Sequence, residues 1–274
     1  VTQPAYTTNG ATWANGYSAV YHMGSSSGRT AIDSSANRFN ATTTNMLDSA
    51  WMAGKVGNGL SFDGIDDLLD TGTYPSRLGI GGSHPRTVSV WAYTRKFNSG
   101  GIYETGNQGN FEFWVLRTYD TENMWRVNHY NGDMNFTYVA KTNWAYFTHW
   151  YDGSVIKVFA DGDQLMVAGT NQLNTTDVYP FRFGQYVGLS ARVDAIIDEC
   201  RISTVARSTN WVWAEHLSME SENSLIRCDS VEESLAPSIR IGELQGLAAA
   251  SVSFQADLIS TGSAPTTVFV CWGE

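Results

Sequence analysis

The stretch that decides the fold is ARVDAIIDECRISTVARSTN, residues 191–210. At its centre, residues 196–203 alternate apolar and charged side chains between small and polar neighbours, which predicts a short β-strand. This strand comes late in the chain and carries two adjacent carboxylates and an arginine, so it needs earlier strands as partners. The best candidate is residues 54–70 (GKVGNGLSFDGIDDLLD), where three glycines precede an alternating strand and an acidic turn follows it.

The composition limits the fold and the partners. The chain has 274 residues, with 26 glycines, 10 tryptophans, 13 tyrosines and 12 phenylalanines, which favours antiparallel sheet over helix. A formal net charge of −10 argues against a nucleic-acid partner, because binding to phosphates needs a basic surface. No apolar run approaches the roughly 20 residues that cross a bilayer, so we expect no membrane span. The acidic, lysine-poor chain starts at Val1 without a signal sequence, and we expect a processed protein that is extracellular or on the cell surface.

A resemblance to a known family rests on three stretches. The glycine-rich strand that ends in Asp-Gly (residues 63–64) and the late Asp-Glu-x-Arg-Ile-Ser strand (residues 198–203) resemble the frame of the laminin-G-like, concanavalin-type jelly-roll domain of bacterial secreted or surface proteins. Residues 144–168 add a strand that begins with tryptophan, an Asp-Gly-Ser hairpin and a strand that ends in a second Asp-Gly. The resemblance implies an all-β fold, a two-sheet antiparallel jelly-roll sandwich of the concanavalin A-like type, over residues 17–219.

Other alternating segments, separated by Gly, Asn and Asp, predict the remaining strands, and one segment predicts a helix. The predicted strands are residues 17–21, 87–93, 101–104, 111–117, 124–130, 134–139, 144–151, 155–160, 164–168 and 181–184, and residues 187–190 are predicted to form a turn. The helix is predicted over residues 210–219, where Trp211, Ala214 and Leu217 share one face. We expect Trp211 and Trp213 to pack against the sandwich.

The two ends of the chain have a different pattern. Residues 1–16 are predicted to be an extended segment that could pair with a neighbour, and residues 220–236 to be an acidic linker. Residues 237–274 predict about three strands and resemble the opening half of an immunoglobulin-like module, a partial Ig-like β segment. A piece below about 40 residues seldom folds alone, because it removes too little apolar area from water to offset chain entropy. Something else must therefore cover these strands.

Three cysteines, Cys200, Cys228 and Cys271, leave at least one thiol unpaired within one molecule. The position of Cys200 on the late strand predicts a small core residue. A disulfide from Cys200 to Cys228 is the alternative, and it requires the segment after Ser218 to fold back over that strand.

A calcium site is predicted from the loop Asp-Ser-Ser-Ala-Asn, residues 33–37. Asp and Asn with small neighbours make a tight turn whose oxygens can converge on a hard cation. In the family that the chain resembles, this loop lies near the late Asp-Glu strand, where a calcium ion can be held. The resemblance therefore implies Asp33, Asn37 and Asp198 as Ca²⁺ ligands. The alternative is an Asx-turn whose carboxylate is satisfied by Arg201 or a backbone amide.

Recognisable catalytic motifs are missing from the sequence. Glycosidases on this type of sandwich place carboxylates as E-x-D-x-x-E, about 5 Å apart, and that spacing does not occur. In the nearest cluster, Asp194, Asp198 and Glu199, alternation predicts that the last two carboxylates lie on opposite faces of the strand. The G-x-S-x-G pattern at residues 24–28 lacks the helix of a nucleophile elbow. We therefore predict that the chain is not an enzyme.

Aromatic residues are dense between residues 103 and 150, and they are candidates for sugar binding. We predict Trp114, Trp125 and Tyr130 as glycan-binding residues, because aromatic faces stack on sugar rings and neighbouring Asn or Asp can bond hydroxyls. The alternative is that these rings fill the core. Three sequons permit N-glycosylation, and they begin at Asn40, Asn135 and Asn174.

Two functions of different classes follow. The preferred one is a non-catalytic extracellular structural or adhesive subunit that assembles head to tail, as a fibre or surface appendage, through β-strand complementation between copies of itself. The alternative is a calcium-dependent carbohydrate-binding module of a larger surface protein.

Overall fold

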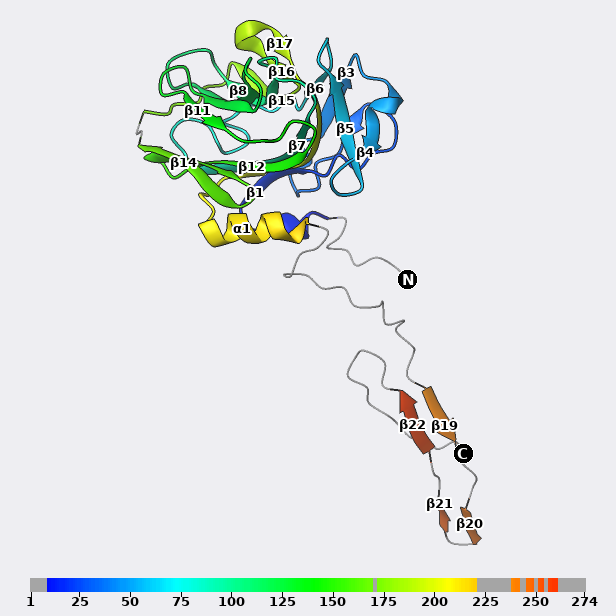
Figure 1. The fold of residues 1–274 in the computed structure, drawn as a ribbon. Helices are drawn as coiled ribbons and strands as arrows, with labels where there is room; N and C mark the ends of the chain where they lie inside the picture. The colour runs from blue at the N-terminus through cyan, green and yellow to red at the C-terminus, as the bar shows by residue number, and fades with distance from the viewer. Residues whose placement is uncertain are drawn as a thin grey trace. The chain divides into compact units, whose positions relative to one another are not determined.

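The computed structural model describes residues 9–169 and 172–220, together with the backbone of four short strands between residues 238 and 260. The chain divides into two units, Val1–Leu225 and Ile226–Glu274. The first unit is a sandwich of two antiparallel sheets with one helix outside it (Figure 1). The predicted two-sheet jelly-roll fold is confirmed. Within the described residues, no helix has the length and apolar character that a membrane crossing needs.

The first sheet, sheet A, has the strand order β14-β13-β12-β7-β18-β5-β4, and β1 also pairs with β18. Its strands are β1 (Tyr17–Tyr21), β4 (Trp51–Ala53), β5 (Asn58–Asp63), β7 (Arg86–Thr94), β12 (Trp144–Tyr151), β13 (Val155–Ala160), β14 (Asp163–Gly169) and β18 (Asp194–Ser203). The second sheet, sheet B, has the order β11-β10-β9-β8-β15-β6-β3-β2. Its strands are β2 (Thr30–Ala31), β3 (Ala41–Thr44), β6 (Leu68–Asp70), β8 (Gly101–Gly106), β9 (Phe113–Thr118), β10 (Met124–Asn128), β11 (Met134–Thr137) and β15 (Tyr179–Phe183).

Shorter elements connect the sheets. They are the 3₁₀ turns η2 (Ala11–Trp13), η3 (Asp48–Ala50) and η4 (Val187–Leu189), and the paired strands β16 (Gln185–Tyr186) and β17 (Ala191–Arg192). Residues 187–190, predicted as the turn before the organising strand, form η4, which ends at Ser190 in the left-handed backbone region.

The predicted organising strand, β18, lies inside sheet A, and all ten of its residues are buried. It pairs with β5 as the sequence predicted, with Ile197 opposite Leu60. The alternation shifts by one residue after Asp198, where the pairing with β7 breaks and Glu199 has a φ of 48°. Ile197 and Cys200 both point into the core cluster, so this bulge takes both Asp198 and Glu199 off the core side. The prediction that these two carboxylates lie on opposite faces is therefore wrong.

Cys200 is fully buried in the core and carries a free thiol, as the first alternative predicted. Its burial raises the pKa of the thiol well above its ordinary value. Cys228 and Cys271 lie outside the described residues.

Helix α1 (Thr209–Ser218) begins after Ser208, whose hydroxyl accepts a hydrogen bond from the Trp211 N–H at 3.2 Å. The helix lies against the outer face of sheet A (Figure 1). Its buried residues are Val212, Glu215 and His216, whereas Trp211 and Trp213 are 37% and 48% exposed. The helix therefore turns a different face to the sheet than the predicted one, because the sheet offers it polar partners.

Both ends of the chain are described in part. Residues 9–16 pack on the sandwich, since the Trp13 ring meets Tyr17 edge-on at 5.2 Å and Arg207 donates to the carbonyl of Asn15. Residues 1–8, where pairing with a neighbour was also predicted, and residues 221–236 of the predicted linker lie outside the described residues. In the second unit, β19 (Ser238–Ile241) pairs with β22 (Ala256–Ser260), and β20 (Gln245–Ala248) pairs with β21 (Ser251–Ser253).

Candidate functional site

The predicted calcium ligands are engaged by the protein itself. The buried Asp33 carboxylate accepts four hydrogen bonds, at 2.9 Å from the Val20 N–H, at 2.8 and 2.7 Å from the N–H and hydroxyl of Ser35, and at 2.8 Å from the Phe39 N–H. The Asn37 side chain donates to the Ser18 carbonyl at 2.8 Å. This is the predicted alternative, a turn whose carboxylate is satisfied by backbone amides.

Asp198 is engaged in the same way. Its carboxylate accepts from the N–H groups of Lys55, Val56 and Glu199 at 2.8, 2.9 and 2.7 Å. Burial and the neighbouring Glu199 nevertheless raise the pKa of Asp198 to about 7. The calcium ion stays a prediction, and any such ion would have to displace these amide donors.

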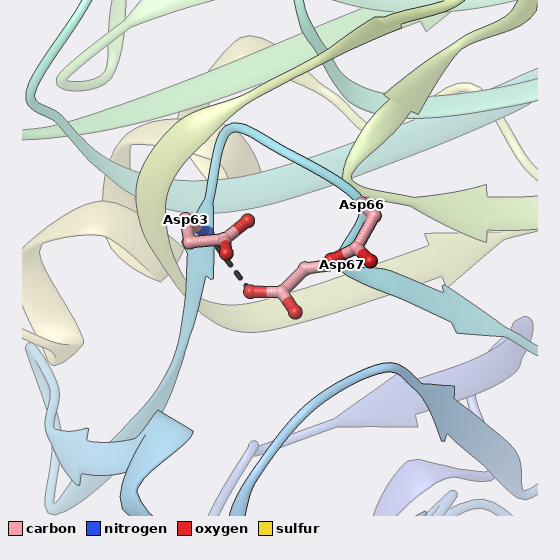
Figure 2. Close-up of side chains that lie close together, drawn as sticks. All are labelled: Asp63, Asp66 and Asp67. Atoms are coloured by element: carbon pink, nitrogen blue, oxygen red, sulfur yellow. Dashed lines mark hydrogen bonds between the residues drawn. The ribbon is translucent and has the colours of Figure 1, made fainter.

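A different cluster, of three aspartates, has carboxylate oxygens that lie close together. Asp63, Asp66 and Asp67 lie at the turn between β5 and β6, and their carboxylate oxygens approach within 4.8 Å of one another (Figure 2). Burial raises the pKa of Asp67 to about 6, and its carboxylate accepts from the Asp63 N–H at 2.9 Å. Carboxylate oxygens are the ligands that Ca²⁺ prefers. In the described part of the chain, this is the one place where three acidic side chains could share a cation.

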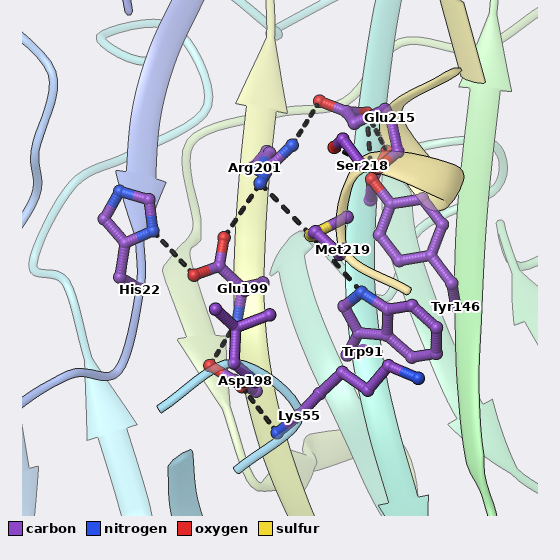
Figure 3. A network of polar contacts seen from close by, with 12 residues as sticks. His22, Lys55, Trp91, Tyr146, Asp198, Glu199, Arg201, Glu215, Ser218 and Met219 are labelled. Atoms are coloured by element: carbon purple, nitrogen blue, oxygen red, sulfur yellow. Dashed lines mark hydrogen bonds and ion pairs between the residues drawn. The ribbon is translucent and has the colours of Figure 1, made fainter. Parts of the chain in front are cut away.

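A buried charged network lies on the outer face of sheet A, where helix α1 covers it (Figure 3). Arg201 is at its centre, and its guanidinium contacts the carboxylates of Glu199 at 2.9 Å and Glu215 at 3.1 Å. His22 lies 2.7 Å from Glu199, and Tyr146 donates to Glu215 at 2.8 Å. The network therefore joins β18, β12 and the residue that follows β1 to the helix.

Glu199 and Arg201 are both charged at neutral pH. Burial alone would raise the pKa of Glu199, but the hydrogen bonds and charges of His22 and Arg201 outweigh it and lower that pKa. Burial alone would lower the pKa of Arg201, but Tyr146, Glu215 and Glu199 raise it. Removing one partner of such a pair leaves an uncompensated buried charge. These residues consequently hold the helix in place.

A groove runs along helix α1 above this network, with a volume of about 330 Å³. Trp211, Ala214 and Ser218 line it from the helix, and Trp13 lines it from η2. Its remaining lining residues are Tyr17, Arg201 and Glu215. We call this hollow the α1 groove. Trp211 donates from its indole N–H to the Tyr17 hydroxyl at 3.2 Å, so the two rings are held in a fixed arrangement.

A second hollow of about 370 Å³ adjoins the C-terminal end of the helix and also includes Ser218. Trp144, Lys55 and Glu220 line it, and the Lys55 ammonium lies 2.9 Å from the Glu220 carboxylate and 4.2 Å from the Trp91 ring centre. Both hollows therefore combine indole rings with fixed polar groups. Such a surface can stack on the apolar face of a ring and bond its hydroxyl groups.

The predicted glycan-binding residues lie elsewhere. Trp114 and Trp125 are both fully buried in the core, so neither ring can reach a sugar, and the prediction is wrong for these two residues. Tyr130 is half-buried, and its hydroxyl donates to Gln108 at 3.0 Å. Trp13 was not predicted as a binding residue, and Trp211 was predicted to pack against the sandwich. The available signal was the pair Trp211 and Trp213, because two helical residues this close in sequence cannot both face the sheet.

The predicted glycosylation sites are all exposed. The Asn40 side chain accepts from the Asp33 N–H at 3.0 Å, and the Asn135 side chain accepts from Arg126 at 2.5 Å. Asn174 lines a third hollow. Glycosylation stays a prediction.

Comparison with known proteins identifies relatives of the fold. The sequence model described as the concanavalin A-like lectin/glucanases superfamily matches residues 63–212. No curated protein gives a significant sequence match.

Solved structures share the fold at low identity. Domain 4 of AbnA, a GH43 extracellular arabinanase from Geobacillus stearothermophilus, in complex with arabinotriose, has a TM-score of 0.54 and 18% identity, and the match covers 72% of this chain and 96% of that domain. The binding domain of Paraclostridial Mosquitocidal Protein 1 has a TM-score of 0.58 and 13% identity, with 74% and 52% coverage. Trypanosoma rangeli sialidase has a TM-score of 0.55 and 13% identity, with 75% and 33% coverage. The match thus spans about half of the mosquitocidal-protein chain and about a third of the sialidase chain.

Proposed function

Because the chain belongs to the concanavalin A-like lectin/glucanases superfamily, we propose that it binds carbohydrate without catalysing a reaction and that the α1 groove is its binding surface. The laminin-G-like, concanavalin-type family predicted from the sequence is the one that matches. The fold alone does not give a function, so the proposal depends on the groove.

One observation carries the proposal, namely that Trp13 and Trp211 line the same groove beside polar groups. Trp211 is 37% exposed although it lies next to a buried network, and its neighbours Tyr17 and Ser218 carry hydroxyl groups. Sugar rings have apolar faces that stack on indoles and hydroxyls that need polar partners. The AbnA domain, which has the same fold over almost its full length, was solved with bound arabinotriose, so the fold is compatible with an oligosaccharide ligand.

The carboxylates beside the groove support binding over hydrolysis. Both oxygens of Glu215 are engaged, since one accepts from Tyr17 at 2.7 Å and the other from Tyr146 at 2.8 Å. Glu199 is ion-paired with Arg201. A glycosidase needs one carboxyl group free to protonate the leaving group and a second to act as base or nucleophile. Neither of these two carboxylates has that freedom.

Glycan-array screening of the purified chain, followed by calorimetry with the best oligosaccharide, tests the proposal. Trp211→Ala removes a ring stack worth about 1 to 1.5 kcal/mol, so the affinity should fall about tenfold. Trp213→Ala is the matched control, because Trp213 is an exposed tryptophan on the same helix that does not line the groove. No retention on any sugar, or equal losses for the two variants, would refute the assignment.

Three finer predictions remain open under this proposal. Head-to-tail assembly depends largely on residues outside the described ones, and light scattering of the purified chain tests it, because a persistent monomer would refute it. Calcium dependence is tested by repeating the glycan screen with a chelator. An extracellular location fits the family and is tested by fractionation of the source cells.

A further inference from the structure

A third hollow, of about 610 Å³, lies at one end of the sandwich, between the loop that precedes β7 and the segment that precedes β15. Gly81, Ser83 and His84 line it from the first segment, and Asn174, Thr176 and Asp177 line it from the second. None of these residues lines the α1 groove. The proposed sugar binding therefore leaves this hollow, which we call the β7 cavity, without a role.

A buried cation lies behind the loop. Arg86 is fully buried, and its guanidinium donates to the carbonyls of Ile80, Gly82 (2.7 Å) and His84 (3.1 Å) and to the Thr175 hydroxyl (2.8 Å). No carboxylate pairs with it among the residues that the structure describes. Burial lowers the pKa of Arg86 to about 9, which still leaves it protonated at neutral pH. Its positive charge is thus balanced by neutral oxygens and by the faces of the Trp114 and Tyr151 rings, whose centres lie 4.8 and 5.4 Å from the guanidinium.

The contacts with Arg86 fix the direction of two backbone N–H groups. Every described peptide bond is trans, so each N–H points opposite to the carbonyl of the same peptide unit. The carbonyls of Ile80 and Gly82 point inward to the guanidinium. The N–H groups of Gly81 and Ser83, which share those peptide units, therefore point away from Arg86, and both residues line the cavity. Within the described part of the chain, neither N–H donates a hydrogen bond.

We propose that the β7 cavity binds a small oxyanion group, a carboxylate or a sulfate, through the N–H groups of Gly81 and Ser83. Backbone N–H groups that converge at a turn form anion-binding concavities, and a nearby positive charge favours the same ligand. The turn requires a φ of 59° at Gly82. Glycine tolerates this angle, whereas a residue with a side chain would be strained there. The group could be part of an acidic sugar or a free ion, and both present the same oxygens.

The Asp177 carboxylate would repel a bound anion, so replacing this residue should change the affinity in a predictable direction. Its carboxylate accepts from the N–H of Ser76 at 2.9 Å and from the Ser76 hydroxyl, and it lines the same cavity. Replacing it by asparagine removes one negative charge and keeps an acceptor for Ser76. Asp177→Asn should therefore bind the anion severalfold more tightly, whereas a site for neutral sugar would gain nothing.

Titrations of the ¹⁵N-labelled chain with galacturonate, sodium sulfate and galactose at pH 7 test the proposal. The amide signals of Gly81 and Ser83 should move with galacturonate, with sulfate or with both, and not with galactose. A response to sulfate alone would assign the site to a free ion, and a response to galacturonate alone would assign it to an acidic sugar.

Two variants complete the experiment. Ser83→Glu should weaken binding at least tenfold, because it puts a negative charge on an exposed residue beside the donors. Thr121→Glu is the control, since it makes the same charge change at an exposed residue that does not line the cavity. Equal shifts with galactose, no movement of either amide signal with both anions, or equal effects of the two Glu variants would overturn the proposal. Because the Trp211 variant does not touch this cavity, failure here is distinct from failure of the α1 groove.

Discussion

Acidification should destabilise the folded chain through one buried histidine, His129. This residue is fully buried, and its Nδ1 lies 3.2 Å from the Gly132 carbonyl, which can only accept a hydrogen bond. Burial lowers the pKa of both His129 and His149, so both rings are neutral at pH 7, and Nε2 of His129 then accepts from Nε2 of His149, 3.1 Å away. Burial lowers the pKa of His129 to about 4, with Arg86 adding to the effect and Asp133 opposing it.

The magnitude follows from the two pKa values. A histidine titrates at about 6.5 in an unfolded chain, so the unfolded state binds more protons than the folded state between pH 6.5 and 4. The stabilisation from a neutral His129 is complete above pH 6.5 and is lost as the pH falls. At pH 5 the loss is about 2 kcal/mol, and it approaches about 3.4 kcal/mol below pH 4.

Three buried carboxyl groups, Asp67 among them, act in the opposite direction, so the wild-type profile alone cannot reveal the effect. Burial raises the pKa of Glu104 and of Asp198 to about 7, and each then stabilises the fold at low pH and loses that contribution as the pH rises from 4 to 7. The comparison must therefore be made against a variant that differs only at the histidine.

His129→Asn supplies that comparison. The Asn amide can donate to Gly132 as Nδ1 does, and it does not titrate. The variant should be less stable at pH 7, because His149 loses its acceptor, by about 1 to 3 kcal/mol. Urea denaturation followed by tryptophan fluorescence at pH 7 and pH 5 should then show that the gap between wild type and variant narrows by about 2 kcal/mol. Parallel profiles for the two proteins would refute the assignment.

Three further predictions concern stability and packing. Glu215→Ala leaves the Arg201 guanidinium with one fewer carboxylate partner beneath α1, so the free energy of unfolding in urea should fall by about 3 to 5 kcal/mol, and a loss below about 1 kcal/mol would contradict a buried ion pair. Cys200→Ser puts a hydroxyl group into the core, so the free energy of unfolding in urea should fall by about 1 to 3 kcal/mol. Native Cys200 should resist alkylation, as read by peptide mass spectrometry, and rapid labelling would contradict its burial. Gly101→Ala puts a methyl group 1.9 Å from the Gln185 carbonyl oxygen, so it should yield no soluble folded protein, and a cooperative unfolding transition would argue against this packing.

The sandwich could be predicted because its strands alternate and its turns use Gly, Asn and Asp. Alternation gives the residues that share a face, but it does not tell which face is inside. In β9 both faces are apolar, with Trp114 and Leu116 in the main core and Phe113 and Val115 in a smaller cluster against Tyr186. The sequence therefore could not separate a core tryptophan from a surface one in this strand.

The bulge in β18 could not be predicted either. A glutamate with positive φ is unfavourable by itself, and at Glu199 it is maintained by contacts with His22 and Arg201, which come from tertiary structure. The packed face of helix α1 was predicted wrongly for a related reason. Hydrophobic spacing favoured Trp211, Ala214 and Leu217 as the packed face, but the outer face of sheet A presents Arg201, which Glu215 satisfies.

Arginine contacts explain how two distant tryptophans come to line one groove. The Arg201 guanidinium lies 5.1 Å from the Trp13 ring centre, and that of Arg207 lies 4.6 Å from the Trp211 ring centre. Arg207 also donates to the Asn15 carbonyl, which fixes the segment that carries Trp13. Relatives at 13% to 18% identity share the sandwich, but the fold alone does not place these side chains. The ligand of this chain should therefore depend on the helix and the η2 turn, which lie outside sheet A, and residues of the core should affect binding only through stability.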